Sequence, residues 1–133
     1  MNDEELIEFG KEYALNSPIK FKHAALIVKG ERDNRRIVAK GYNRYIPDLM
    51  NHDHSIHAEI AALEDFMDNR VNIRLPKQKR IAQAKNIMKK STYYMFVIRL
   101  GKQKISKTGY SKPCHKCQAE IEQWNIREIY YTT

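Results

Sequence analysis

The chain has 133 residues, which is the size of one domain, so we expect a single domain over residues 1–133 that buries its core without disulfide bonds. A hydrophobic share of 42% argues against an intrinsically disordered chain. No apolar run is long enough to cross a bilayer, so we expect no membrane partner. The net charge is +8, and its uneven distribution favours partners that carry phosphates.

The N-terminal third predicts a helix followed by a β-hairpin. Residues 3–15 place apolar side chains near one face and acidic residues in the first turn, where the helix dipole favours them. Residues 23–28 and 36–43 predict two strands joined by a polar turn. The acidic N-terminus lacks the apolar segment of a secretory signal, so we expect a cytoplasmic or other intracellular location.

The rest of the chain predicts helices that alternate with strands. Residues 92–100 form a near-continuous β-branched and aromatic run, which is typical of a strand buried on both faces. The other predicted elements are a helix from His57 to about Asn69, a short amphipathic helix in the second half of residues 70–90, a loop over 101–113 that could hold one short strand, a helix over 114–124 and a final strand over 127–133.

A basic block occupies residues 70–116. No acidic residue occurs between Asp68 and Glu120, whereas that interval holds fourteen lysines and arginines. By subtraction (+8 minus +14), the remainder of the chain carries about −6. Such a block predicts a phosphate-bearing partner, either a nucleotide or a nucleic acid bound through residues 70–116. The alternative is a solvated helix face followed by lysine-rich loops.

Only two cysteines occur, Cys114 and Cys117, and they lie within one helical turn of each other. A disulfide that closes so short a loop would restrict the unfolded chain very little. In a reducing compartment the spacing favours a metal pair or a redox dithiol. Pro113 suits a helix start, and the positive end of that helix would favour the thiolates that bind metal.

A histidine and a glutamate lie at the start of another predicted helix. His57 can supply a third ligand to a zinc ion held by the two cysteines, which leaves the fourth position for water, as in catalytic zinc sites. Glu59 is then free to act on that water as a general base. Each motif alone is weak: "HAE" is common, and "PCxxC" also occurs in redox dithiols and structural zinc knuckles.

Together these motifs resemble those of the cytidine and deoxycytidylate deaminase superfamily, which also includes tRNA adenosine deaminases and polynucleotide cytosine editors. The resemblance rests on "HAE" at 57–59, "PCHKC" at 113–117, "GYN" at 41–43 and the order of the predicted elements. It implies an α/β protein with the three-layer α/β/α cytidine-deaminase-like fold and a mixed sheet of four to five strands.

The resemblance also implies roles for individual residues. His57, Cys114 and Cys117 match the zinc ligands, and Glu59 matches the residue that carries protons while ammonia leaves the base. The implied substrate contacts are the backbone amides of Ala58 and Cys114 at the attacking oxygen, the carbonyl of Lys112 at the departing amine, the side chain of Asn43 at the sugar or base, and His54 at the mouth of the pocket. Asn43 is equally well explained as a strand-terminating turn residue, and for His54 a surface loop histidine is the favoured interpretation.

Two departures from the family pattern affect the expectations. The zinc motifs are further apart than in compact members because of the basic stretch. The chain also stops after residues 127–133, where many relatives continue into another helix and strand. We expect this to leave an exposed sheet edge that a second subunit covers, and therefore a homo-oligomer.

The leading hypothesis is a zinc-dependent hydrolase acting on C–N bonds that converts a cytosine nucleoside or nucleotide, dCMP-like or cytidine-like, to its uracil form. The alternative is a deaminase that acts on a base in tRNA, other RNA or single-stranded DNA. A third hypothesis is a non-catalytic, zinc-stabilised nucleic-acid-binding module. The intact Glu59 counts against the third, because a purely structural zinc site has no use for it.

Overall fold

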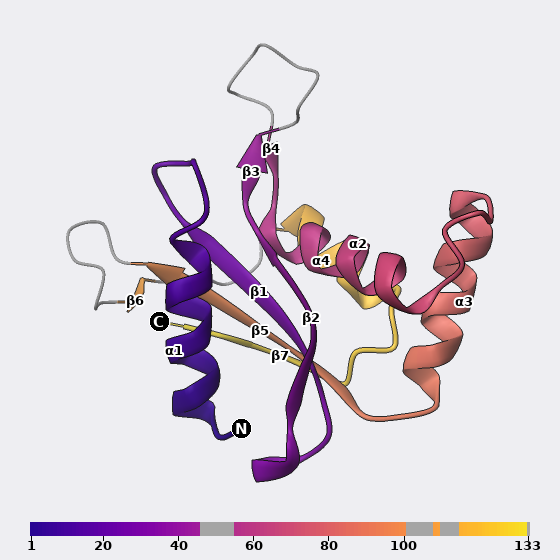
Figure 1. Ribbon diagram of the computed structural model, residues 1–133, viewed down its shortest axis with the longest axis horizontal. Coiled ribbons are helices and arrows are strands. Elements are labelled where there is room, and N and C mark those ends of the chain that lie inside the picture. Colours follow the sequence, from indigo (N-terminus) through magenta and orange to yellow (C-terminus); the bar gives the residue numbers. More distant parts are fainter. Residues whose placement is uncertain (46–54, 101–107, 110–114, 133) are drawn as a thin grey trace.

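The computed structural model describes residues 1–45, 55–100, 108–109 and 115–132. It shows a mixed β-sheet with helices on both faces (Figure 1). One helix covers one face of the sheet, and three helices cover the other. The first is α1 (Asp3–Ala14), and the other three are α2 (Ala58–Arg70), α3 (Lys77–Lys89) and α4 (His115–Glu122).

Within the described residues the main sheet has five strands. They are β1 (His23–Lys29), β2 (Arg36–Tyr42), β5 (Tyr93–Leu100), β6 (Thr108–Gly109) and β7 (Glu128–Tyr131). The order is β2, β1, β5, and the far edge of β5 is shared by β7 along its first half and β6 at its end. β1 is antiparallel to both neighbours, whereas β7 is parallel to β5.

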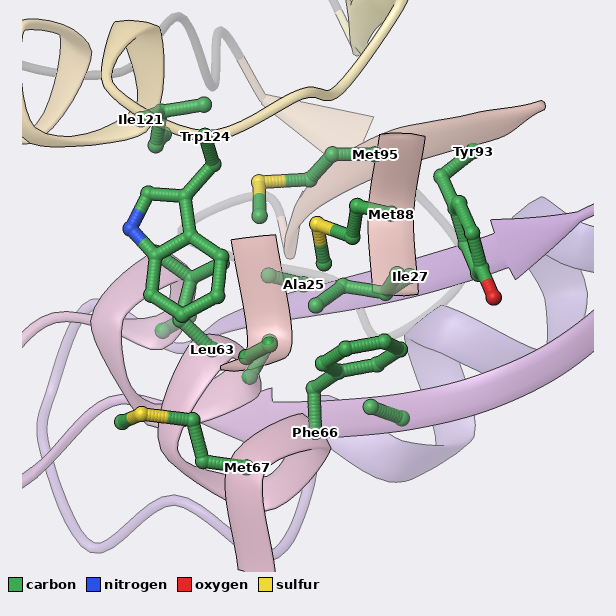
Figure 2. Close-up of a cluster of buried hydrophobic side chains, with 14 of the residues drawn as sticks. Ala25, Ile27, Leu63, Phe66, Met67, Met88, Tyr93, Met95, Ile121 and Trp124 are labelled. Atoms are coloured by element: carbon green, nitrogen blue, oxygen red, sulfur yellow. The ribbon is translucent and has the colours of Figure 1, made fainter. Parts of the chain in front are cut away.

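Alternate residues of β1 face the two helical layers, as the period of a strand requires. Leu26 and Val28 pack with Leu6 of α1, which begins with a capping box between Asn2 and Glu5. The intervening residues of β1 belong to the larger cluster beneath α2 and α3 (Figure 2). Its buried side chains include Ala25, Ile27, Leu63, Phe66, Met88, Tyr93 and Met95.

The expected three-layer α/β/α fold is confirmed, and so are the predicted helices and strands, with three differences. α3 is a full 13-residue helix that begins directly after Pro76, because proline suits the start of a helix. The final strand is shorter than predicted. Nothing in the sequence pattern predicted the separate ribbon of β3 (Arg44–Tyr45) and β4 (Ser55–Ile56). None of the described helices is long and apolar enough to cross a bilayer.

Candidate active site

Two helices begin at the same end of the sheet. β2 and β5 both run antiparallel to β1, and α2 and α4 both return against that shared direction. The start of each helix therefore lies beyond the carboxyl ends of β2 and β5, and Figure 1 shows α4 behind α2 with the same direction. In α/β sheets this is the end where ligands bind. The start of α2, which follows His57, and the start of α4, which holds the described part of the second motif, are thus brought to one end of the fold.

The start of α2 presents one exposed and one buried polar side chain. His57 is the N-cap residue and has an extended backbone, but its side chain makes no capping hydrogen bond. The imidazole therefore does not cap the start of the helix. Glu59, in the first turn, is only 5% exposed, and Ala58 between them is buried. The positive end of the helix dipole stabilises a carboxylate at this position.

A second histidine lies close to His57. His23 opens β1, and burial lowers the pKa of its imidazole below the ordinary value, while electrostatic interactions with the neighbouring Arg99 and His57 lower it further. The carbonyl oxygen of Phe21, 3.2 Å from Nδ1 of His23, acts in the opposite direction. Burial thus favours the neutral form of the His23 imidazole beside the candidate ligand His57. From the sequence alone, a strand start is the favoured interpretation of His23, ahead of a substrate contact.

Asn43 follows β2 directly and joins this strand end to the start of β1. Its Oδ1 accepts a hydrogen bond of 2.8 Å from the backbone N–H of His23, and its Nδ2 donates one of 2.7 Å to the carbonyl of Phe21. The carbonyl of Asn43 accepts a 2.6 Å bond from the buried hydroxyl of Ser17. These bonds give Asn43 the strand-end role that its residue type favours. A substrate contact by the same side chain stays a prediction.

Gly41 sets how closely α2 approaches the sheet. A Cβ atom built at this position would lie 2.4 Å from the backbone nitrogen of Ala62 and 2.6 Å from the carbonyl carbon of Ala61. The absence of a side chain therefore lets the first turns of α2 rest on β2. A glycine inside a predicted strand is the sequence signal that could have identified this contact.

α4 is anchored to α2 through the core. Ile121 and Trp124 are buried in the same cluster as Leu63 and Met67, and Figure 2 shows the Trp124 indole beside Leu63. Cys117 lies one helical turn before Ile121. The backbone of Cys117 is part of α4, but its side chain lies outside the described part of the structure. Three other predicted site residues, Cys114, Lys112 and His54, also lie outside the described residues.

The donor set fits zinc by its chemistry. One imidazole that is not used for capping and two cysteines at the start of a second helix are nitrogen and sulfur ligands of the kinds zinc prefers. Two helix N-termini at the same end of the sheet favour thiolate and carboxylate groups there. Among the described side chains no group of three histidine, cysteine, aspartate or glutamate residues is placed to hold a metal ion. His57 belongs to these described side chains, whereas the side chains of both cysteines lie outside them.

The basic helix α3 lies far from this end of the sheet. Arg80 forms an ion pair with Asp68 near the end of α2, with 3.6 Å between Nη1 and Oδ1. From His57 to Asp68 the helix rises about 16 Å. Lys85 lies over the Trp124 ring, 6.0 Å from its centroid. Two of the basic side chains of α3 therefore have structural contacts, and the helix packs against the far end of α2.

Comparisons with known proteins identify relatives of the chain. The model of the cytidine and deoxycytidylate deaminase zinc-binding region matches residues 1–133. A search of curated proteins finds no match. Among solved structures, the dCMP deaminase from the cyanophage S-TIM5 in complex with dCMP and dUMP has a TM-score of 0.60 at 18% identity, covering 96% of this chain and 78% of that chain.

Two further structures share the fold. The apo form of the S-TIM5 enzyme has a TM-score of 0.56 at 19% identity, covering 98% of this chain and 84% of that chain. The cytidine deaminase from Mycobacterium tuberculosis has a TM-score of 0.51 at 12% identity, covering 100% of this chain and 86% of that chain. At these identities the likeness establishes a common architecture.

Proposed function

Because the chain belongs to the cytidine and deoxycytidylate deaminase family, and is thus a zinc-dependent hydrolase acting on C–N bonds, we propose that it deaminates a cytosine nucleoside or nucleotide. Deoxycytidylate-like nucleotides are the leading substrate candidates. The observation that supports this best is the buried carboxylate of Glu59 in the first turn of α2, two residues from the exposed His57. A carboxylate buried at a helix start beside a candidate ligand suits proton transfer better than a structural role.

The proposed zinc ligands are His57, Cys114 and Cys117. When bound, zinc activates water at neutral pH and stabilises the charge that develops in hydrolysis. His57 is held by its N-cap position at the start of α2, and Cys117 by the first turn of α4. Since both helices pack into one core cluster, their starts are fixed relative to each other.

Glu59 carries the protons of the reaction. Its carboxylate takes a proton from the attacking water and gives it to the ring nitrogen beside the amine-bearing carbon. The water oxygen adds to that carbon, the second water proton passes through Glu59 to the amine, and the C–N bond breaks. Ammonia leaves, and the base keeps a carbonyl in place of its amine.

The remaining contacts of the substrate belong to the same proposal. The backbone amide of Ala58 would stabilise the attacking oxygen, as the amides of helix N-termini stabilise anions. The carbonyl of Lys112 would receive the departing amine. The side chain of Asn43 would contact the sugar or base, and His54 would lie at the mouth of the pocket.

The substrate class is tested by measuring ammonia release from a panel of cytosine and adenine nucleosides, their 5′-monophosphates and short single-stranded oligonucleotides. We expect kcat/KM to be highest for a cytosine monophosphate. Comparable or faster turnover of an adenine compound, or of an oligonucleotide, contradicts the proposal.

Zinc content tests the ligand assignment. We expect the purified protein to hold about one zinc per chain, and His57→Ala or Cys114→Ala to lower that content because a tetrahedral site loses one of its three protein ligands. His23→Ala is the matched control, since His23 lies near His57 but is not a proposed ligand. Elemental analysis of the three variants decides the matter. Unchanged zinc in Cys114→Ala would show that the assignment is wrong.

Substitutions in the basic helix α3 distinguish a free-nucleotide substrate from a polynucleotide substrate. Arg80 and Lys85 have structural contacts, so the informative variant replaces the exposed lysines Lys77, Lys79 and Lys89 by glutamine. Charges beyond about 10 Å are largely screened at ordinary salt, and α3 packs about 16 Å along α2 from His57. We therefore expect kcat/KM on a mononucleotide to change less than about twofold. A large loss on the mononucleotide would contradict this expectation, and a loss confined to oligonucleotide substrates would favour a nucleic-acid track along α3.

A further inference from the structure

Three neighbouring strands each carry one polar residue at the end of the sheet where α2 and α4 begin. Asn43 follows β2, His23 opens β1, and Arg99 lies near the end of β5, directly opposite His23 in the strand register. Ala25 of β1 and Val97 of β5 belong to the core cluster beneath α2 and α3. Because strand residues two positions apart share a face, His23 and Arg99 lie on the sheet face that carries the candidate active site.

His23 connects Arg99 with the candidate zinc ligand His57. Both of these residues act electrostatically on the His23 imidazole, so both are its neighbours. β4 ends directly before His57 and pairs with β3, which directly follows Asn43. Asn43 in turn accepts a hydrogen bond from the backbone of His23. Arg99 therefore belongs to the surroundings of the candidate site, two strand spacings or about 10 Å from Asn43.

The ring of Phe21 brings a second cation to the same place. Cζ of Arg99 lies 5.2 Å from the centroid of this ring, and Nζ of Lys20 lies 5.8 Å from it. The backbone beside the ring is held in place, since the carbonyl of Phe21 accepts a 2.7 Å hydrogen bond from Nδ2 of Asn43. Lys20 is exposed and Arg99 is half-buried, so a ligand that enters from solvent can reach both cations.

The charge at this end of the sheet is positive in the described part of the chain. No acidic residue occurs in the stretches that meet here, which are residues 15–24, 41–45, 55–58 and 98–100. Besides Lys20 and Arg99, the same stretches contain Lys22 and Arg44. Only the charge of Arg44 is offset by a known acidic partner, Glu64 of α2. An excess of positive charge beside a site favours a substrate that carries a negative group.

We propose that Arg99 and Lys20 bind the 5′-phosphate of the substrate, so that the site selects a nucleoside monophosphate over the free nucleoside. This assignment rests on the proposed function, which places the base at the start of α2. The sugar then extends along the strand ends toward Arg99, over a span comparable to the length of a mononucleotide. The planar guanidinium can donate two parallel hydrogen bonds to phosphate oxygens, whereas the ammonium group of Lys20 adds a point charge.

The values of kcat/KM for 2′-deoxycytidine and for its 5′-monophosphate test the assignment. In Arg99→Gln we expect the value for the monophosphate to fall at least about tenfold, because hydrogen bonds to a charged group are lost. The loss should lie mainly in KM, as for binding that is equal in the ground state and the transition state. The value for the nucleoside should change less than about twofold, since it has no phosphate to lose.

Two further variants make the result specific. Lys20→Gln should lower kcat/KM for the monophosphate about two- to fivefold, as expected for an exposed charge. Arg127→Gln is the matched control and should change neither value. Arg127 makes an exposed ion pair with Glu31, and its backbone N–H bonds the carbonyl of Tyr93, at the opposite end of β5 from Arg99.

The outcomes that overturn the assignment differ from those that overturn the proposed function. Equal losses on the nucleoside and the monophosphate in Arg99→Gln overturn the phosphate contact, and so does an unmodified chain that deaminates both compounds with the same kcat/KM. A loss confined to a single-stranded oligonucleotide also overturns it, because the two cations would then follow a polynucleotide backbone. Calorimetry measures binding without turnover. A chain that binds the monophosphate through Arg99 but releases no ammonia contradicts the proposed function and supports the phosphate contact.

Discussion

Replacing Glu59 by glutamine is expected to lower kcat by a factor of about 10² to 10⁴, the range that general acid–base catalysis contributes. The side chain is only 5% exposed at the start of α2, so the isosteric amide keeps the packing but loses the ability to carry a proton. The fold and the zinc content should be retained, because Glu59 is not a proposed ligand.

Glu64→Gln is the matched control for this result. Glu64 lies on the same helix and makes an exposed ion pair with Arg44, with 3.4 Å between Nη2 and Oε2. Exposed pairs of this kind contribute little to stability. Glu64 is not a proposed site residue, so kcat should also be nearly unchanged. Ammonia release and zinc content are measured for both variants. Full turnover in Glu59→Gln would refute the mechanism, whereas loss of zinc would show that Glu59 supports the metal.

The second large effect is expected for Gly41→Ala. The added methyl group would meet the backbone of Ala61 and Ala62 at 2.6 Å or less, and backbone cannot rotate away as a side chain can. We expect a loss of about 1–3 kcal/mol in the free energy of unfolding, as for overpacked sites. Because the helix that carries His57 and Glu59 must shift, kcat should also fall, on the order of 10²-fold for a displacement near 1 Å.

Gly10→Ala separates misplacement from simple instability. Its Cβ would lie 2.5 Å from Cδ1 of Ile98, which is the end of a side chain, and it lies on the α1 face of the sheet. That variant should lose stability while its folded fraction turns over normally. Denaturant unfolding gives the stability of both variants, and kcat under conditions where each is folded gives the rate. Equal kcat for Gly41→Ala and the unmodified chain would show that Gly41 has only a packing role.

Local patterns were sufficient for most of the secondary structure. The apolar period of residues 3–15 and the β-branched run at 92–100 correspond to α1 and β5, because a helix face and a buried strand leave their own spacing in the sequence. The ribbon of β3 and β4 could not be predicted in this way. Each strand has two residues, which is too few to show a period.

The sequence by itself determined which residue types are available for chemistry: a histidine and a glutamate at one helix start, and two cysteines at another. Ligand preference and helix spacing depend only on neighbouring residues, so they can be read without a fold. Tertiary structure decided that both helices begin at the same end of the sheet. That outcome depends on β2 and β5 having the same direction, although about fifty residues separate them.

Tertiary structure also decided what individual residues do. It showed that the Asn43 side chain joins two strand ends, that Gly41 lets α2 rest on β2, and that the basic helix α3 lies away from the candidate site. Each of these facts is a contact or a separation between segments distant in sequence, which local propensity does not encode, because packing of the whole chain determines it.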